Sequence, residues 1–246
     1  MGTRVLNKYF RYLNLVYKGS APAPASVLSV DGVKADPVTS VRDLGIYIDA
    51  DLSMRTHVQR TFRGVLPHLA SCNRFDRCTN SYRQPRSRHW WSFSFLSRLD
   101  YGNGVLVGLP AYLVRRLQSV LNASARLTHH LRRSDHIVDA LVSLHWLLVP
   151  KFIQYKIAVL TYKILYGTAP RYLGPLVLVS NLPGQRALRS TCTSRLVVPP
   201  FKLSTIGDRT FKVAAARTWN DLPEDVTSSS STPSIFSNRL KTHLFR

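Results

Sequence analysis

Apolar residues recur at helical spacing through much of the second half of the chain. From about residue 111, Leu113, Leu117, Val120, Leu121 and Leu131 fall on one stripe, and the arginines of the same segment lie mostly elsewhere. A long amphipathic helix is therefore predicted to begin near residue 111.

Two further helices are predicted between residues 134 and 170. Ser134 or Asp135 is suitable as the N-cap of the first. Its apolar stripe consists of Ile137, Leu141 and Leu144. Pro150 suits the first turn of the second helix, and Gly167 followed by Pro170 ends it. The apolar stripe of that helix consists of Ile153, Ile157, Leu160 and Ile164.

Residues 180–207 are rich in loop formers, with one strand expected at 195–198 before two prolines. Asp208 is placed to cap a helix that extends through Trp219, and Thr232-Pro233 is typical of the start of a last helix. The apolar residues of that last helix are Ile235, Phe236, Leu240 and Leu244.

The first half carries strand patterns instead. Residues 27–30 and 33–34 flank Asp31-Gly32, which favours a tight hairpin because these residues tolerate positive φ. Residues 41–48 alternate as one strand, with Leu44, Ile46 and Ile48 on one face. The pattern as a whole predicts a mainly α (α+β) fold that begins with a small antiparallel sheet.

Over most of their length, residues 55–90 follow neither the alternation of a β-strand nor the periodicity of an α-helix. They hold one acid, Asp76, and eight arginines, at positions 55, 60, 63, 74, 77, 83, 86 and 88. One interpretation is an RNA-binding arm in which aromatic side chains stack on bases, namely Phe75, Tyr82, Trp90 and Trp91. The other is a frameshift, because the codons for residues 89–91 encode Leu-Val in a neighbouring frame. We favour the frameshift, since a local break between consistent segments indicates disturbance.

The formal charge of +21 and the sequence pI of about 10.6 indicate a polyanionic partner. Arg outnumbers Lys 25 to 9, and guanidinium groups match phosphate geometry. The alternative is that GC-rich coding DNA inflates the arginine content. The three cysteines fit neither a disulfide framework nor a zinc site. The sequence shows no membrane-spanning run and no signal peptide, so an intracellular location, nucleus or cytoplasm, is expected.

Several sequence blocks occur in a characteristic order along the chain: VRDLGIYIDADLSMRTHV, SRLDYGNGVLVGLP, LVRRLQSVLNASARL, SDHIVDALVSLHWL, LSTIGDRTFKVAAARTWNDLP and RLKTHLFR. In this order and spacing they resemble the end of LINE-type (non-LTR) retrotransposon reverse transcriptases. The resemblance covers roughly residues 27–63 and 94–246, whereas residues 1–26 and 64–93 depart from the family pattern.

The resemblance implies a palm-edge remnant with a β-hairpin at 1–52 and a helical thumb-like and C-terminal region at 97–246. Between them lies the Arg-rich irregular tract at 53–96. Such enzymes bind two Mg²⁺ ions through an upstream Asp and an Asp-Asp turn. No Asp-Asp pair occurs in this chain. Asp49 and Asp51 are separated by Ala50 and are expected to accept turn hydrogen bonds. No catalytic residue, metal site or cofactor is therefore predicted, and the chain is not expected to be an enzyme as it stands.

Other candidate motifs have structural interpretations. His129 and His130 fall in the first predicted helix and point about 100° apart, which disfavours a shared metal ion. Gly102-Asn103-Gly104 is followed by no phosphate-loop Lys and is predicted to be a turn. Trp146 and Trp219 lie on apolar stripes and are predicted to be core residues.

The expected function is that of a non-catalytic fragment of an RNA-directed DNA polymerase. It would bind RNA or DNA backbones without sequence preference, and we expect no membrane partner and no small-molecule substrate. The residues predicted to contact phosphates are Arg115, Arg116, Arg126, Arg132, Arg133 and Lys151. The alternative is a host-retained helical scaffold or chromatin-associated interaction protein. Polymerase activity would require a separate palm or a longer chain.

Overall fold

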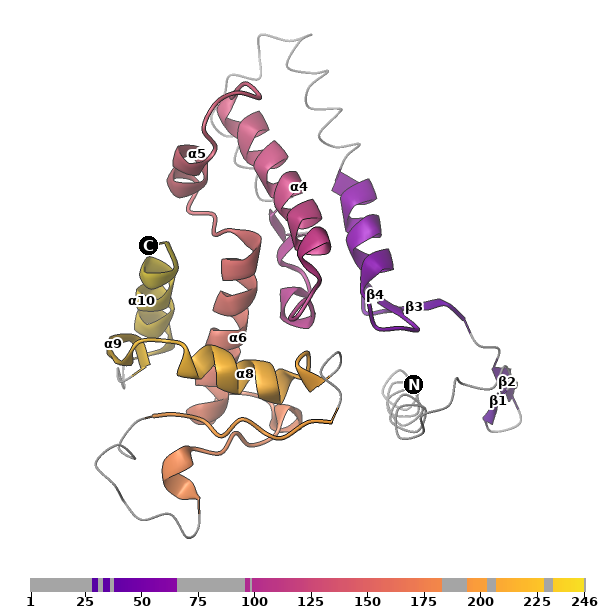
Figure 1. The fold of residues 1–246 in the computed structure, drawn as a ribbon, viewed down its shortest axis with the longest axis vertical. Helices are drawn as coiled ribbons and strands as arrows, with labels where there is room; N and C mark the ends of the chain where they lie inside the picture. The colour runs from indigo at the N-terminus through magenta and orange to yellow at the C-terminus, as the bar shows by residue number, and fades with distance from the viewer. Residues whose placement is uncertain are drawn as a thin grey trace. The chain divides into compact units, whose positions relative to one another are not determined.

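The structure is a computed structural model that describes residues 28–30, 33–35, 38–65, 96–97, 99–182, 194–202, 207–227 and 232–245. The chain divides into two compact units, Met1–Val41 and Arg42–Arg246. The described residues are mainly helical, with short antiparallel strands, which confirms the predicted fold class at this level (Figure 1).

The first unit contains the predicted hairpin. Strand β1 (Leu28–Val30) pairs antiparallel with β2 (Val33–Ala35), and Val30 is the partner of Val33. Only two residues connect the strands, as the Asp-Gly pair predicted.

A second hairpin replaces the single strand predicted at 41–48. It consists of β3 (Ser40–Asp43) and β4 (Ile46–Asp49), joined by Leu44 at φ 44° and Gly45 at φ 86°. Two consecutive positive φ angles define a type I′ turn. Leu44 is 75% exposed, so its predicted place on a buried face is wrong. The two-residue turn preserved the apolar alternation, and the pattern therefore resembled one continuous strand.

The first part of the tract that we expected to be irregular is an α-helix, residues 55–65. Val58 and Val65 are fully buried on its inner face. Before the helix, the Asp49 carboxylate accepts hydrogen bonds from the Thr56 amide and the Ser53 hydroxyl, both at 3.1 Å. The rest of the tract, from residue 66 to 95, lies outside the described residues, as do both interpretations of it.

Asp51 accepts a hydrogen bond from the Ser53 amide at 3.0 Å, and this bond lowers the pKa of Asp51. Both aspartates are thus turn acceptors, as predicted.

The long predicted helix is α4 (Ala111–His129), and its buried residues include four of the five predicted apolar positions. The fifth, Leu131, lies beyond the helix because His130 adopts φ 51° and ends it. Leu131 therefore does not belong to the helical stripe, contrary to the prediction. His129 is the last residue of α4 and His130 lies outside it, so the prediction that both lie within the helix is also wrong. A short 3₁₀ helix, η2 (Asn103–Val105), precedes α4 where a turn was predicted.

The next helix, α5 (Val138–Ser143), begins later than predicted and has no side-chain cap. The Asp135 carboxylate instead accepts a hydrogen bond from the Arg132 amide at 2.7 Å within the preceding turn. Helix α6 (Val149–Leu165) has Pro150 in its first turn and is followed by Gly167 at φ 69°, which confirms both predicted boundaries.

The C-terminal part consists of short 3₁₀ helices followed by α-helices. Their bounds are η3 (Arg171–Leu173), η4 (Val179–Asn181), α8 (Phe211–Asn220), α9 (Glu224–Thr227) and α10 (Pro233–Phe245). The strand predicted at 195–198 is reduced to one antiparallel bridge between Leu178 and Leu196. Helix α10 begins as predicted, but Ile235 is exposed and does not join Phe236 in the core.

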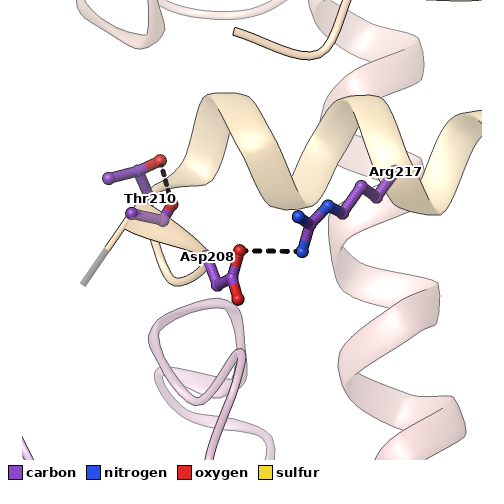
Figure 2. Close-up of polar contacts among 4 residues, drawn as sticks. Asp208, Thr210 and Arg217 are labelled. Carbon is purple, nitrogen blue, oxygen red and sulfur yellow. Dashed lines mark hydrogen bonds and ion pairs between the residues drawn. The ribbon is translucent and has the colours of Figure 1, made fainter. Parts of the chain in front are cut away.

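Asp208 does not cap α8, contrary to the prediction. The N-cap is Thr210, whose hydroxyl donates to the Gly207 carbonyl at 2.7 Å. Asp208 lies two residues before this position. Its carboxylate forms an ion pair with Nη1 of Arg217, on α8, at 2.9 Å (Figure 2).

The end of α8 holds the 194–196 segment in place. The Asn220 side-chain amide accepts a hydrogen bond from the Leu196 amide at 2.8 Å and donates to the Leu196 carbonyl at 2.9 Å. Trp219 Nε1 donates to the Ser194 carbonyl at 2.8 Å. These contacts replace much of the strand pairing that was predicted here.

Two hydrophobic clusters form the core of the second unit, and α6 contributes to both. Ile153 and Ile157 pack in the first cluster with α4 and residues 54–65. Ala158 and Tyr162 pack in the second cluster with α8 and α10. Trp146 belongs to the first cluster and Trp219 to the second, which confirms that both are core residues.

Gly102 has φ 76°, and a Cβ atom there would lie 2.8 Å from Ile46 Cδ1. We expect Gly102→Ala to lower the free energy of unfolding by about 1–2 kcal/mol from the left-handed backbone alone, and by more because of this contact. Gly167→Ala is the matched control, because Gly167 has φ 69° but nothing within 4 Å of a Cβ. Urea unfolding followed by circular dichroism measures both, and equal losses would contradict the contact.

Candidate nucleic-acid interface

Helix 55–65 and α4 lie side by side (Figure 1), and an arginine of each helix contacts an aromatic ring of the other. The Arg116 guanidinium carbon lies 4.8 Å from the ring centroid of Phe62, and that of Arg55 lies 6.0 Å from the ring centroid of Tyr112. Neither helix contains an acidic residue. The pair therefore forms a basic surface whose cations are positioned by aromatic rings.

Of the predicted phosphate contacts, Arg115 and Arg116 are exposed near the start of α4. Arg115 Nε donates a long hydrogen bond of 3.4 Å to the Ala111 carbonyl. Arg126 is half-buried, and its Nε has no hydrogen-bond partner among the described residues. Arg115 and Arg116 are thus available to a ligand, whereas Arg126 is less accessible.

The remaining three predicted residues lie elsewhere. Arg132 and Arg133 are exposed in the loop that follows α4, whose end at His129 lies about 21 Å along the helix axis from Arg115 at 1.5 Å per residue. Lys151 is exposed in the first turn of α6, whose Val149 amide donates to Gln118 of α4 at 2.8 Å. The six predicted residues are therefore spread along α4 and its neighbours, and they do not form a single cluster.

Sequence reasoning missed the basic residues of helix 55–65 as part of an ordered surface. Arg55, Arg60 and Arg63 are exposed on this helix. Over residues 55–90 as a whole the sequence shows no helical or strand periodicity, which predicts an irregular tract. The apolar residues Val58, Phe62 and Val65 recur at helical spacing and would have indicated the helix in a shorter window.

A cleft of about 640 Å³ opens between the β3–β4 hairpin, helix 55–65 and the segment that ends at Tyr101. The residues that line it are Arg42, Gly45, Tyr47, His57, Arg60, Thr61, Gly64, Ser97 and Tyr101. The Tyr101 hydroxyl donates a hydrogen bond to the Leu44 carbonyl at the tip of the hairpin. This bond holds one wall of the cleft against another.

The polar groups of the cleft are mostly cations and donors. The guanidinium carbons of Arg60 and Arg42 lie 4.9 and 5.8 Å from the ring centroid of Tyr47. His57 Nδ1 accepts a hydrogen bond from the Tyr47 amide at 3.4 Å. Burial lowers the pKa of His57, against the opposing charge of Asp49, so the imidazole is neutral at pH 7.

Arg209, by contrast, uses its guanidinium group for hydrogen bonds within the fold. Arg209 Nε donates to the Val107 carbonyl at 3.2 Å, and its Nη1 donates to the Leu52 carbonyl. Burial lowers the pKa of Arg209, although the negative charge of Asp51 opposes the shift. Arg209 thus connects three segments that are distant in sequence.

The predicted histidine pair lies at the end of α4, where His129 Nε2 and the Ser143 hydroxyl are 3.1 Å apart. Among the described residues, no group of three or more His, Cys, Asp or Glu side chains is arranged to hold a metal ion. In the same part of the chain, no helix has the length and apolar character needed to cross a membrane.

Comparisons with protein-family models, with curated proteins and with solved structures found no match to this chain.

Proposed function

We propose that this chain is a non-catalytic fragment of a retrotransposon RNA-directed DNA polymerase that binds RNA or DNA backbones. The observation that carries the binding proposal is the acid-free surface shared by helix 55–65 and α4. In this proposal the β3–β4 hairpin is the edge of the former palm, and the helices from α4 onward correspond to thumb and C-terminal regions.

The arrangement of the surface suits an extended polyanion. Five arginines of the two helices are exposed, namely Arg55, Arg60, Arg63, Arg115 and Arg116. Arg132 and Arg133 continue the positive charge beyond the end of α4. A row of guanidinium groups along a helix contacts successive phosphates and carries no base-specific information, so sequence-independent binding is expected.

The contacts of the aspartates near the hairpin support the assignment of no polymerase activity. The Asp49 and Asp51 carboxylates accept hydrogen bonds from residue 53, just after their turn, and from residue 56 in the first turn of helix 55–65. In two-metal phosphoryl transfer, carboxylates must instead converge on ions about 3.5–4 Å apart. These two residues therefore serve the hairpin and the start of helix 55–65.

The binding proposal predicts a specific change in salt dependence. The double variant Arg115→Gln/Arg116→Gln should reduce the slope of log affinity against log salt by about 1.4–1.8, because each lost phosphate contact removes roughly 0.7–0.9. Fluorescence anisotropy with a labelled 20-nucleotide RNA and with a DNA duplex, from low to moderate salt, measures the slope.

The matched control is Arg239→Gln/Lys241→Gln on α10, which removes the same charge away from the proposed surface. An equal reduction of slope in the control would show that net charge alone drives binding. Binding that does not vary with salt in the unmodified chain would contradict the proposal and favour the alternative, a helical interaction protein with no role for phosphate contacts.

A further inference from the structure

We propose that the cleft lined by Arg42, Tyr47, His57, Arg60 and Tyr101 binds a single nucleoside phosphate monoester. This site shares helix 55–65 with the proposed surface, but no residue of α4 lines it, and it does not depend on the proposed function. It also departs from the expectation of no small-molecule ligand. Each wall of the cleft contributes a different part of the recognition.

Two arginines from different elements converge on the cleft. Arg42 belongs to β3 and Arg60 to helix 55–65, yet both guanidinium groups lie within 6 Å of the Tyr47 ring centroid. Neither forms an ion pair with a carboxylate among the described residues, and the lining contains no acid. Two guanidinium groups that line one cleft without a carboxylate partner in the described part of the chain match the charge of a dianionic phosphate bound there.

Helical spacing places the residues of one wall of the cleft together. His57, Arg60, Thr61 and Gly64 follow each other at i, i+3, i+4 and i+7, so they share one face of helix 55–65. Because His57 Nδ1 accepts the Tyr47 amide hydrogen, the neutral imidazole carries its proton on Nε2. The same wall therefore adds an N–H donor and a hydroxyl to the two arginines.

The opposite wall accommodates a nucleoside. Tyr101 is 53% exposed, and its hydroxyl is bound to the Leu44 carbonyl, so the ring is held in position. At Gly45 the lack of a side chain keeps the approach to the ring open, since a Cβ there would lie 3.2 Å from Tyr101 Cε1. A volume of about 640 Å³ exceeds that of a phosphate and lies within the range of small-molecule pockets. An aromatic base can stack on such a ring.

The test uses the full chain and isothermal titration with AMP, adenosine and inorganic phosphate at fixed ionic strength. AMP is expected to bind at least tenfold more tightly than either of the others. Arg42→Gln and Arg60→Gln should each weaken AMP binding about tenfold or more, and Arg60→Lys should weaken it less because it keeps the charge without the fork. Both arginines are exposed, so these variants should fold, which circular dichroism checks.

Two controls separate this site from the proposed function. Arg239→Gln on α10 removes one charge outside the cleft and should leave AMP affinity unchanged. Arg115→Gln/Arg116→Gln should also leave AMP affinity unchanged, even where it weakens RNA binding. A trinucleotide with and without a 5′-phosphate distinguishes a strand end from a free nucleotide, and tighter binding of the phosphorylated form or of AMP supports the site in either case.

Three results would overturn the proposal. One is the absence of saturable AMP binding. Another is equal affinity for AMP and adenosine, which would leave the arginines without a role. The third is an equal loss of AMP affinity in Arg60→Gln and Arg239→Gln, which would show that the net charge of the chain alone determines AMP affinity.

Discussion

Trp219→Ala is expected to lower the free energy of unfolding by about 3–5 kcal/mol, the largest single effect that we predict. The indole is 2% exposed in the second hydrophobic cluster. Its ring centroid lies 5.8 Å from that of Phe236, which in turn stacks on Tyr162 at 4.3 Å. The substitution would remove one end of this aromatic group, leave a cavity beside Phe236, and remove the hydrogen bond to the Ser194 carbonyl. A loss of this size is a large fraction of the total stability of a typical domain, about 5–15 kcal/mol.

Urea unfolding monitored by circular dichroism measures the effect. Tyr172→Ala is the control, because Tyr172 is 84% exposed and its removal should change stability by less than about 0.5 kcal/mol. Trp219→Phe keeps an aromatic ring without the N–H donor and should give an intermediate loss. If Trp219→Ala and Tyr172→Ala proved equally stable, the second cluster would not be organised around the indole.

Arg209→Met should also be strongly destabilising, with a loss of about 1.5–3 kcal/mol from hydrogen bonds that involve a charged donor. Methionine keeps most of the aliphatic stem, which lies close to Gly108, but it cannot donate to the Val107 and Leu52 carbonyls. Those carbonyls belong to segments more than a hundred residues away in sequence. The variant should therefore loosen the attachment of the turn before helix 55–65.

Arg217→Met is the matched control for this prediction. Arg217 lies on α8, close in sequence to Arg209, and forms an ion pair with Asp208, but its side chain is about half exposed. Exposed ion pairs typically contribute about 0–1 kcal/mol. Thermal and urea unfolding of the two variants should thus rank Arg209→Met as the less stable. The reverse order would contradict the claim that the hydrogen bonds of Arg209 stabilise the fold.

The helices of the second half were predictable because their start and end signals are local. Pro150 and Gly167 bound α6 within a residue or two of the predicted positions, since proline suits a first turn and glycine accepts positive φ. Capping was predicted less well. Asp135 and Asp208 both have partners near them, Arg132 and Arg217, that compete with the helix amides for the carboxylate.

Less of the first half could be predicted from the sequence. The Leu44-Gly45 turn interrupts no apolar alternation, so a hairpin resembled one strand. The arginines of α4 could be named from the sequence, but their pairing with helix 55–65 could not. The cleft brings together residues from 42 to 101, and no local pattern marks contacts at such separations. Only the packing of the hairpin on Tyr101 and Gly102 defines it.

The double hydrogen bond between Asn220 and Leu196 has a consequence for self-association. A short strand with an unpaired edge is a template on which a second chain can add. Here the Val177 carbonyl and Val179 amide bind one edge of the segment, and the Asn220 amide occupies both backbone groups of Leu196. A side chain thereby takes the place of a neighbouring strand, and Leu196 offers no free backbone group from which intermolecular β-sheet growth could begin.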